Sequence, residues 1–138
     1  MIKKHRIIVD TNLWISFLLT RQFNFIDKLL KNKNVQLVFC SELLLEFLDV
    51  VKRPKLKKYF SKPDVDNLLE IIEEYAVFIE VTSAVEICRD KKDNFLLALA
   101  KDSSADYLIT GDSDLLIIKK FEETEIVTIA EYKIEIEI

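Results

Sequence analysis

Five acidic residues stand out in the 138-residue sequence because each ends, interrupts or precedes an apolar stretch. They are Asp10 after "RIIV", Glu46 within "LLLEFL", Asp93 before "NFLLALA", and Asp112 and Asp114 in "LITGDSD". Carboxylates that lie close together repel one another, and a divalent cation removes that repulsion. Oxygen ligands without histidine or cysteine favour Mg²⁺ or Mn²⁺. Such an ion can activate water and offset charge on a phosphate, so these residues predict metal-dependent hydrolysis of phosphodiester bonds.

Each of these acids also has a purely structural explanation. Asp10 and Asp93 suit helix N-caps, Glu46 could face solvent, and Asp112 suits a turn. Taken one at a time, these structural roles are common. The joint pattern favours a site, because Asp10, Asp93 and Asp112 all fall where predicted elements begin or end. Glu46 adds to it, because a lone carboxylate on an apolar helix face is costly to bury.

The elements that must position these acids alternate between strands and helices. Short apolar runs predict strands, and runs with helical periodicity predict amphipathic helices. We expect strands near 6–9, 35–40, 77–81, 106–110 and 125–129, and helices near 12–19, 23–34, 42–51, 62–76 and 93–105. This alternation predicts an α/β domain with a mainly parallel sheet of about five strands, and sites beyond the carboxyl ends of those strands. The alternating "KIEIEI" of residues 133–138 predicts a terminal strand or a tail.

The composition fits a single domain over residues 1–138. Half of the residues are apolar, and one glycine with two prolines leaves room only for short loops. Cys40 and Cys88 lie in apolar contexts, so we expect reduced thiols and a cytoplasmic protein. Together with His5 they cannot form a zinc site of the usual spacing, and a single histidine argues against histidine acid–base ribonuclease chemistry. No apolar run is long enough for a membrane span, and no signal peptide is evident.

Three segments in order resemble the PIN-domain nucleases, in particular their bacterial and archaeal toxin branch. The segments are "VDTNLWISFLL", "SELLLEFLDVVKRPKLKKYF" and "CRDKKDNFLLALAKDSSADYLITGDSDLL", and the likeness runs from residue 7 to about 118. The resemblance implies a Rossmann-like sheet and an endoribonuclease that depends on Mg²⁺ or Mn²⁺. It also implies a cognate antitoxin as protein partner, RNA as substrate and, as in many PIN toxins, a homodimer.

The resemblance assigns roles to individual residues. The catalytic and metal-binding acids would be Asp10, Glu46, Asp93 and Asp112, with Asp114 as a further ligand of variable role. The supporting polar residues would be Thr11, Asn12 and Thr110, which orient an acid or bind water. Asp90 competes with Asp93 for one ligand position, and we prefer Asp93 because the apolar helix starts directly behind it.

One basic run offsets the acidic net charge of −4, which by itself weighs against a nucleic-acid binder. Residues 51–63, "VKRPKLKKYFSKP", hold six Lys or Arg and no acid. An acidic site repels a polyanion, so RNA needs positive charge nearby, and Pro54 is expected to end a helix and turn the run outward. We therefore predict RNA contacts from Arg53, Lys55, Lys57 and Lys58. The alternative is a solvated stretch between two helices.

Two other functions remain open at this point. A PIN-fold module without activity could bind RNA or protein. A phosphatase of the haloacid dehalogenase type also places an aspartate after its first strand, but it needs a second acid where this chain has Asn12.

Overall fold

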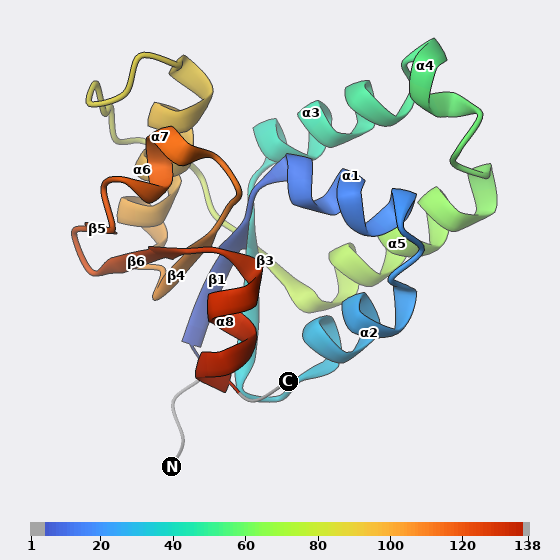
Figure 1. The fold of residues 1–138 in the computed structure, drawn as a ribbon, viewed down its shortest axis with the longest axis horizontal. Coiled ribbons are helices and arrows are strands. Elements are labelled where there is room, and N and C mark those ends of the chain that lie inside the picture. The colour runs from blue at the N-terminus through green and yellow to red at the C-terminus, as the bar shows by residue number, and fades with distance from the viewer. Residues whose placement is uncertain (1–4, 137–138) are drawn as a thin grey trace.

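A six-stranded sheet forms the centre of the computed structural model, which describes residues 5–136 (Figure 1). The strands are β1 (His5–Val9), β2 (Val35–Phe39), β3 (Ala76–Phe78), β4 (Tyr107–Ile109), β5 (Lys120–Phe121) and β6 (Thr124–Val127). The helices are α1 (Thr11–Leu19), α2 (Phe23–Lys31), α3 (Ser41–Val51), α4 (Pro54–Lys57), α5 (Lys62–Tyr75), α6 (Lys91–Ser103), α7 (Ser113–Leu116) and α8 (Ile129–Ile136). The predicted α/β fold with a mainly parallel sheet is confirmed, with the two-residue β5 as an unpredicted sixth strand.

The order of the strands, β3-β2-β1-β4-β6-β5, creates the position for a site. The chain steps outward from β1 through β2 to β3, then returns to the other side of β1 with β4. All neighbouring pairs are parallel except β5 with β6. Val9 and Ile109 are partners at the carboxyl ends of β1 and β4, so the residues that follow them meet at one edge. Sheets of this type bind ligands at such a switch point.

Helices cover both faces of the sheet, so its central strands are buried on both sides. Figure 1 shows α1, α2, α3 and α5 together on one side of the strands, and α6 and α7 on the other. Ile8, Leu108 and Leu97 have no exposed surface, and Trp14 is only 1% exposed. Trp14 therefore belongs to the core. Within residues 5–136, none of the helices combines the length and apolar character that crossing a membrane requires.

The end of the chain differs from the sequence prediction. Residues 133–136 form the end of α8, so the predicted terminal strand is wrong there, and residues 137–138 lie outside the described residues. A capping box starts α8, because the Thr128 hydroxyl accepts from the Glu131 amide (3.2 Å) and the Glu131 carboxylate accepts from the Thr128 amide (3.0 Å). The helix then buries Tyr132, whose hydroxyl lies 3.0 Å from His5 Nε2. The capping box and the burial of Tyr132 explain why the end of the chain is helical despite its alternating sequence pattern.

An irregular connection, residues 79–90, leads into α6 and is held by Asp102 on that helix. The Asp102 carboxylate accepts hydrogen bonds from the amides of Thr82 (2.7 Å) and Ser83 (2.9 Å) and from the Ser83 hydroxyl. The Ser83 hydroxyl contributes most to lowering the pKa of Asp102, and the two amides add to the shift. The connection is therefore tied to α6 by a charge-assisted network.

Asp102→Ala is expected to loosen this connection with a modest loss of about 1 kcal/mol in the free energy of unfolding. Limited proteolysis should cut the variant faster within residues 79–90. Because the folded-state pKa is lowered, the stabilisation is present above the ordinary pKa of 3.8 and fades as the pH falls below it. Asp27→Ala, which removes an exposed acid of an exposed ion pair on α2, is the control. Equal cutting of both variants would contradict the assigned role of Asp102.

Candidate metal centre

The first predicted acid, Asp10, lies where β1 ends and α1 begins. Its Oδ1 accepts a hydrogen bond from the amide of Asn12 (3.1 Å), which caps α1, and its Oδ2 accepts from the hydroxyl of Thr110 (2.8 Å). The residue is only 8% exposed. Asn12 thus orients Asp10 through its backbone while its side chain is exposed, and Thr11 is buried at the start of α1.

Thr110 joins Asp10 to a second acid, Asp112. Thr110 follows β4, has no exposed surface, and accepts a hydrogen bond from the Asp112 amide (3.0 Å) through the same hydroxyl that donates to Asp10. Asp112 caps the short helix α7, because its Oδ1 accepts from the Asp114 amide (2.9 Å). The carboxyl ends of β1 and β4 therefore hold two aspartates in fixed orientation through one buried hydroxyl.

The start of α6 separates the roles of Asp90 and Asp93. Asp90 is the N-cap, with its Oδ1 accepting from the amide of Lys92 (2.8 Å), and it is exposed. Asp93 lies in the first turn and is 4% exposed, and its Oδ2 is buried without a hydrogen-bond partner. A buried carboxylate oxygen without a partner requires an explanation, because desolvation of the charged form is expensive.

Asp93, Asp112 and Asp114 bring their carboxylates together. One oxygen of each lies within 4.8 Å of the others, a spacing that could hold a metal ion. Asp10 is connected to this group through Thr110, and its pKa responds to the charge of Asp112. Asp114 also forms an exposed ion pair with Arg89 (3.6 Å). The structure thus places Asp114, predicted as a further ligand of variable role, in the same group as Asp93 and Asp112.

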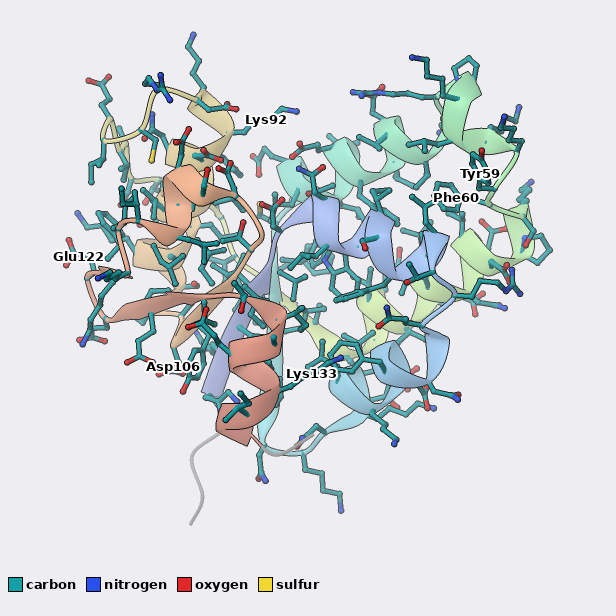
Figure 2. The ribbon with its side chains drawn as sticks, viewed as in Figure 1. Tyr59, Phe60, Lys92, Asp106, Glu122 and Lys133 are labelled. Atoms are coloured by element: carbon teal, nitrogen blue, oxygen red, sulfur yellow. The ribbon has the colours of Figure 1, made fainter. Side chains whose placement is uncertain are left out.

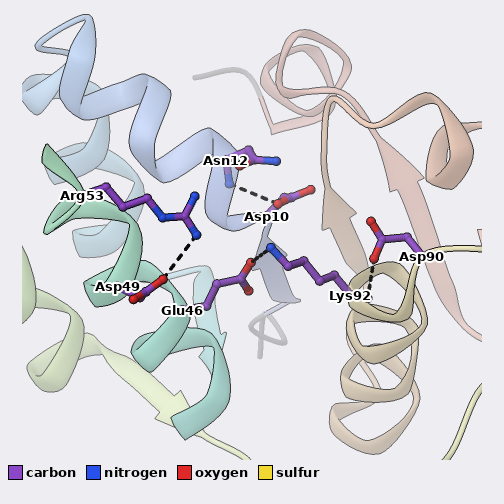
Figure 3. Close-up of polar contacts among 7 residues, drawn as sticks. All are labelled: Asp10, Asn12, Glu46, Asp49, Arg53, Asp90 and Lys92. Atoms are coloured by element: carbon purple, nitrogen blue, oxygen red, sulfur yellow. Dashed lines mark hydrogen bonds and ion pairs between the residues drawn. The ribbon is translucent and has the colours of Figure 1, made fainter. Parts of the chain in front are cut away.

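Glu46 faces the group from α3 on the opposite side of the site. Its side chain is 30% exposed, and its Oε1 lies 3.1 Å from the Nζ of Lys92 on α6 (Figure 3). The expectation of a lone carboxylate on a buried helix face is therefore wrong. The sequence could not reveal Lys92 as its partner, because the contact joins residues of two helices that lie far apart in the chain.

Burial and mutual repulsion disfavour the ionised carboxylates of Asp93 and Asp10. Burial is the main cause that raises the pKa of Asp93 to about 7, followed by its contact with Asp112 and the charges of Asp112, Asp90 and Asp10. Burial also raises the pKa of Asp10, although the hydrogen bonds from Thr110 and Asn12 oppose the shift. A hard divalent cation relieves both desolvation and repulsion, and it prefers oxygen ligands. The residues present therefore fit such an ion.

The predicted RNA-binding residues all lie on the surface, in the segment that follows α3. Arg53, Lys55, Lys57 and Lys58 are exposed, and Arg53 pairs with Asp49 on α3 (3.3 Å). Figure 3 shows Arg53 and Asp49 on the side of α3 that carries Glu46. α3 ends at Val51, about 7.5 Å along the axis beyond Glu46, and Arg53 follows after the C-cap residue Lys52. The basic run thus begins at the outer end of α3, and Figure 1 shows α4 at the opposite end of that helix from α6 and α7.

The two aromatic residues at the end of the basic run differ in exposure. Tyr59 is 57% exposed, and the Nζ of Lys58 lies 5.1 Å from the centroid of its ring. Phe60 is 9% exposed and packs into the core (Figure 2). Of the two, Tyr59 is therefore the one available for stacking with a base.

Comparisons with known proteins agree with this architecture. Residues 6–114 match the profile of a family described as PIN domain. Over 120 residues, the chain is 29% identical to the uncharacterized protein MJ1680 of Methanocaldococcus jannaschii, a match that covers 84% of this chain and 76% of that protein. The fold is similar to the crystal structure of VapBC2 from Rickettsia felis bound to a DNA fragment from their promoter, with a TM-score of 0.54, 15% identity and coverage of 88% and 96% of the two chains. Because the profile matches well over half of the chain, including all five acids of the site, the chain belongs to the PIN domain family.

Proposed function

We propose that this chain is a Mg²⁺- or Mn²⁺-dependent endoribonuclease, the toxin of a toxin–antitoxin pair, which hydrolyses RNA phosphodiester bonds in the cytoplasm. PIN domains are generally nucleases. The observation that carries the proposal is the Oδ2 of Asp93, which is buried without a hydrogen-bond partner beside Asp112 and Asp114. Two free cysteines agree with a reducing compartment.

In this proposal the chain supplies a rigid set of oxygen ligands at the switch point of the sheet. The ligands would be Asp10, Glu46, Asp93, Asp112 and Asp114. A divalent cation held there supplies activation of an attacking water and compensation of charge on the reacting phosphate. Thr110 and the Asn12 amide fix the orientation of Asp10, so little reorganisation is needed when substrate arrives. Arg53 and the lysines that follow it would hold the RNA strand.

The activity test uses the full chain with a single-stranded RNA labelled at one end. We expect internal cleavage with Mn²⁺ or Mg²⁺ and none in excess EDTA. Binding of RNA without cleavage under every metal condition would favour the inactive module instead. Hydrolysis of a small phosphomonoester without cleavage of RNA would favour a phosphatase, which nothing in the site supports because the exposed Asn12 stands where a second acid is needed.

The proposed toxin role includes a protein partner. The similar Rickettsia felis structure is of VapBC2 with promoter DNA, and this supports an antitoxin for the present chain. Expression of the chain alone should arrest growth, and co-expression of the neighbouring short reading frame should restore it. Self-association into a homodimer is part of the same proposal and is measured by light scattering. If cells grow normally while they express an active nuclease, the chain is an RNA-processing enzyme and not a toxin.

Replacing Arg53, Lys55, Lys57 and Lys58 with glutamine is expected to weaken RNA binding far more than it slows cleavage of bound RNA. Each lost phosphate contact should reduce the slope of log K against log salt by roughly 0.7 for single strands. Fluorescence anisotropy at several salt concentrations measures this slope, and single-turnover cleavage measures the bound reaction.

A charge-matched control removes four exposed lysines from other surfaces. These are Lys28, Lys33, Lys119 and Lys120. Their replacement with glutamine should change the salt slope much less. The same slope in both quadruple variants would mean that RNA approaches the acids along a different surface.

A further inference from the structure

The ammonium group of Lys92 forms an ion pair with Glu46, one of the proposed metal ligands. Lys92 extends from α6 toward α3, and its Nζ lies 3.1 Å from the Oε1 of Glu46 (Figure 3). The side chain of Lys92 is 66% exposed and that of Glu46 is 30% exposed. Ion pairs of such exposure contribute little to stability, so this one breaks at low cost.

A pocket of about 240 Å³ separates the two helices at this point. Its lining residues are Glu42, Glu46, Lys91, Lys92 and Phe95. When Glu46 turns toward a cation, the charged side chains that remain in the pocket are the positive Lys91 and Lys92 and the negative Glu42. The pocket then carries a net positive charge next to the acids, which suits a phosphate of a bound strand.

The backbone of Lys92 is fixed, so the exchange requires only its side chain to move. The amide of Lys92 donates to Asp90 Oδ1 (2.8 Å) in the first turn of α6. The lysine side chain is a flexible stem of four carbons that ends in a compact positive charge. This charge can pair with either a carboxylate or a phosphate, because neither pairing requires a fixed orientation. Figure 2 shows Lys92 at the end of α6 that faces α3.

We propose that Lys92 is a phosphate-binding residue that exchanges partners: it pairs with Glu46 while the site is free of metal, and it binds RNA phosphate once Glu46 has turned to the cation. The inference rests on the proposed function, since it requires Glu46 to be a metal ligand. It couples the two occupants of the site. Metal binding frees the lysine that holds the strand, and RNA binding withdraws the ammonium that competes for Glu46.

The test compares Lys92→Gln with Lys91→Gln. Lys91 is the adjacent residue, has the same charge and lines the same pocket, whereas the ion pair with Glu46 belongs to Lys92. Calorimetric titration with Mn²⁺ in the absence of RNA should give a dissociation constant about 2–5-fold lower for Lys92→Gln than for Lys91→Gln, because a competing cation has been removed. Melting curves of both variants establish that they are folded.

The second measurement is binding of a fluorescein-labelled oligouridine, followed by stopped flow before cleavage. With Mn²⁺, Lys92→Gln should bind several-fold more weakly than Lys91→Gln and show a salt slope smaller by roughly 0.7. In EDTA the two variants should bind equally, because the ammonium of Lys92 is then engaged by Glu46.

Any other pattern overturns the exchange. Equal Mn²⁺ affinity of the two variants would mean that Lys92 does not compete for Glu46. A loss of oligouridine binding by Lys92→Gln that is as large in EDTA as in Mn²⁺ would make Lys92 an ordinary RNA contact. A wild-type chain that binds no Mn²⁺ would refute the proposed function and the exchange with it, whereas normal wild-type binding with equal variants refutes the exchange alone.

Discussion

Asp10→Asn is expected to lower the rate of Mn²⁺-dependent RNA cleavage by about 100-fold or more while the fold stays intact. The substitution removes one negative charge from the proposed metal ligands. Loss of such a ligand typically reduces the stabilisation of the transition state by several kcal/mol. The amide of the new side chain can still accept from Asn12 and donate to Thr110, which replace the present contacts of 3.1 and 2.8 Å. Single-turnover cleavage and a melting curve measure the two effects.

The other proposed ligands provide a ranking and a control. Asp93→Asn, Asp112→Asn and Glu46→Gln should each remove most activity, and Asp114→Asn should have a smaller effect because Arg89 already engages that carboxylate. Asp27→Asn, which lies in an exposed ion pair on α2, should leave cleavage unchanged. Near wild-type cleavage by Asp10→Asn, or wild-type cleavage that persists in excess EDTA, would refute the metal-dependent mechanism.

The edge of the sheet that carries Asp10 and Asp112 was predictable because its signals are local. Each aspartate closely follows a short apolar run, and parallel strands that alternate with helices bring such ends to one edge. The preference for Asp93 over Asp90 rested on the start of the apolar helix. The structure shows Asp90 as the N-cap and Asp93 as the buried acid. Which of them binds metal stays a prediction.

Thr110 was predicted as a supporting residue, but its bond to Asp10 and the partner of Glu46 were not, because both contacts join distant segments of the chain. Thr110 unites Asp10 and Asp112 because β1 and β4 are neighbours, although their residues lie about a hundred positions apart. The pairing of Glu46 with Lys92 has the same origin. No local pattern distinguishes Lys92 from other exposed lysines.

The helical end of the chain had a local signal that the alternating pattern obscured. Thr128 and Glu131 have the spacing of a capping box, and the structure contains both of its hydrogen bonds. Tyr132 then packs against His5 and Tyr107 with edge-to-face rings. The capping box and the burial of Tyr132 therefore outweigh the alternation of apolar and charged residues.

Asp93→Asn is expected to stabilise the metal-free protein at pH 8 by about 2–4 kcal/mol, although it should remove most activity. In the folded chain the pKa of Asp93 is raised from 3.8 to about 7, chiefly by burial and then by Asp112. The folded state therefore holds a proton that the unfolded state has lost between these two values, and stability falls as the pH rises through this window. Below pH 4 both states are protonated and the penalty vanishes.

Chemical unfolding in EDTA at a series of pH values between 4 and 8 measures the effect. The wild type should lose stability across the window, and Asp93→Asn should lose less, so the two curves separate toward pH 8. Asp27→Asn is the control, because Asp27 lies in an exposed ion pair on α2 and is not among the groups that shift the pKa of Asp93. Added Mn²⁺ should then raise the stability of the wild type at pH 8 more than that of Asp93→Asn, since the cation offsets the charge that burial disfavours. If the free energy of unfolding depends on pH in the same way for the wild type and Asp93→Asn, the pKa of Asp93 is not raised. Its burial then gives no reason for a cation to bind.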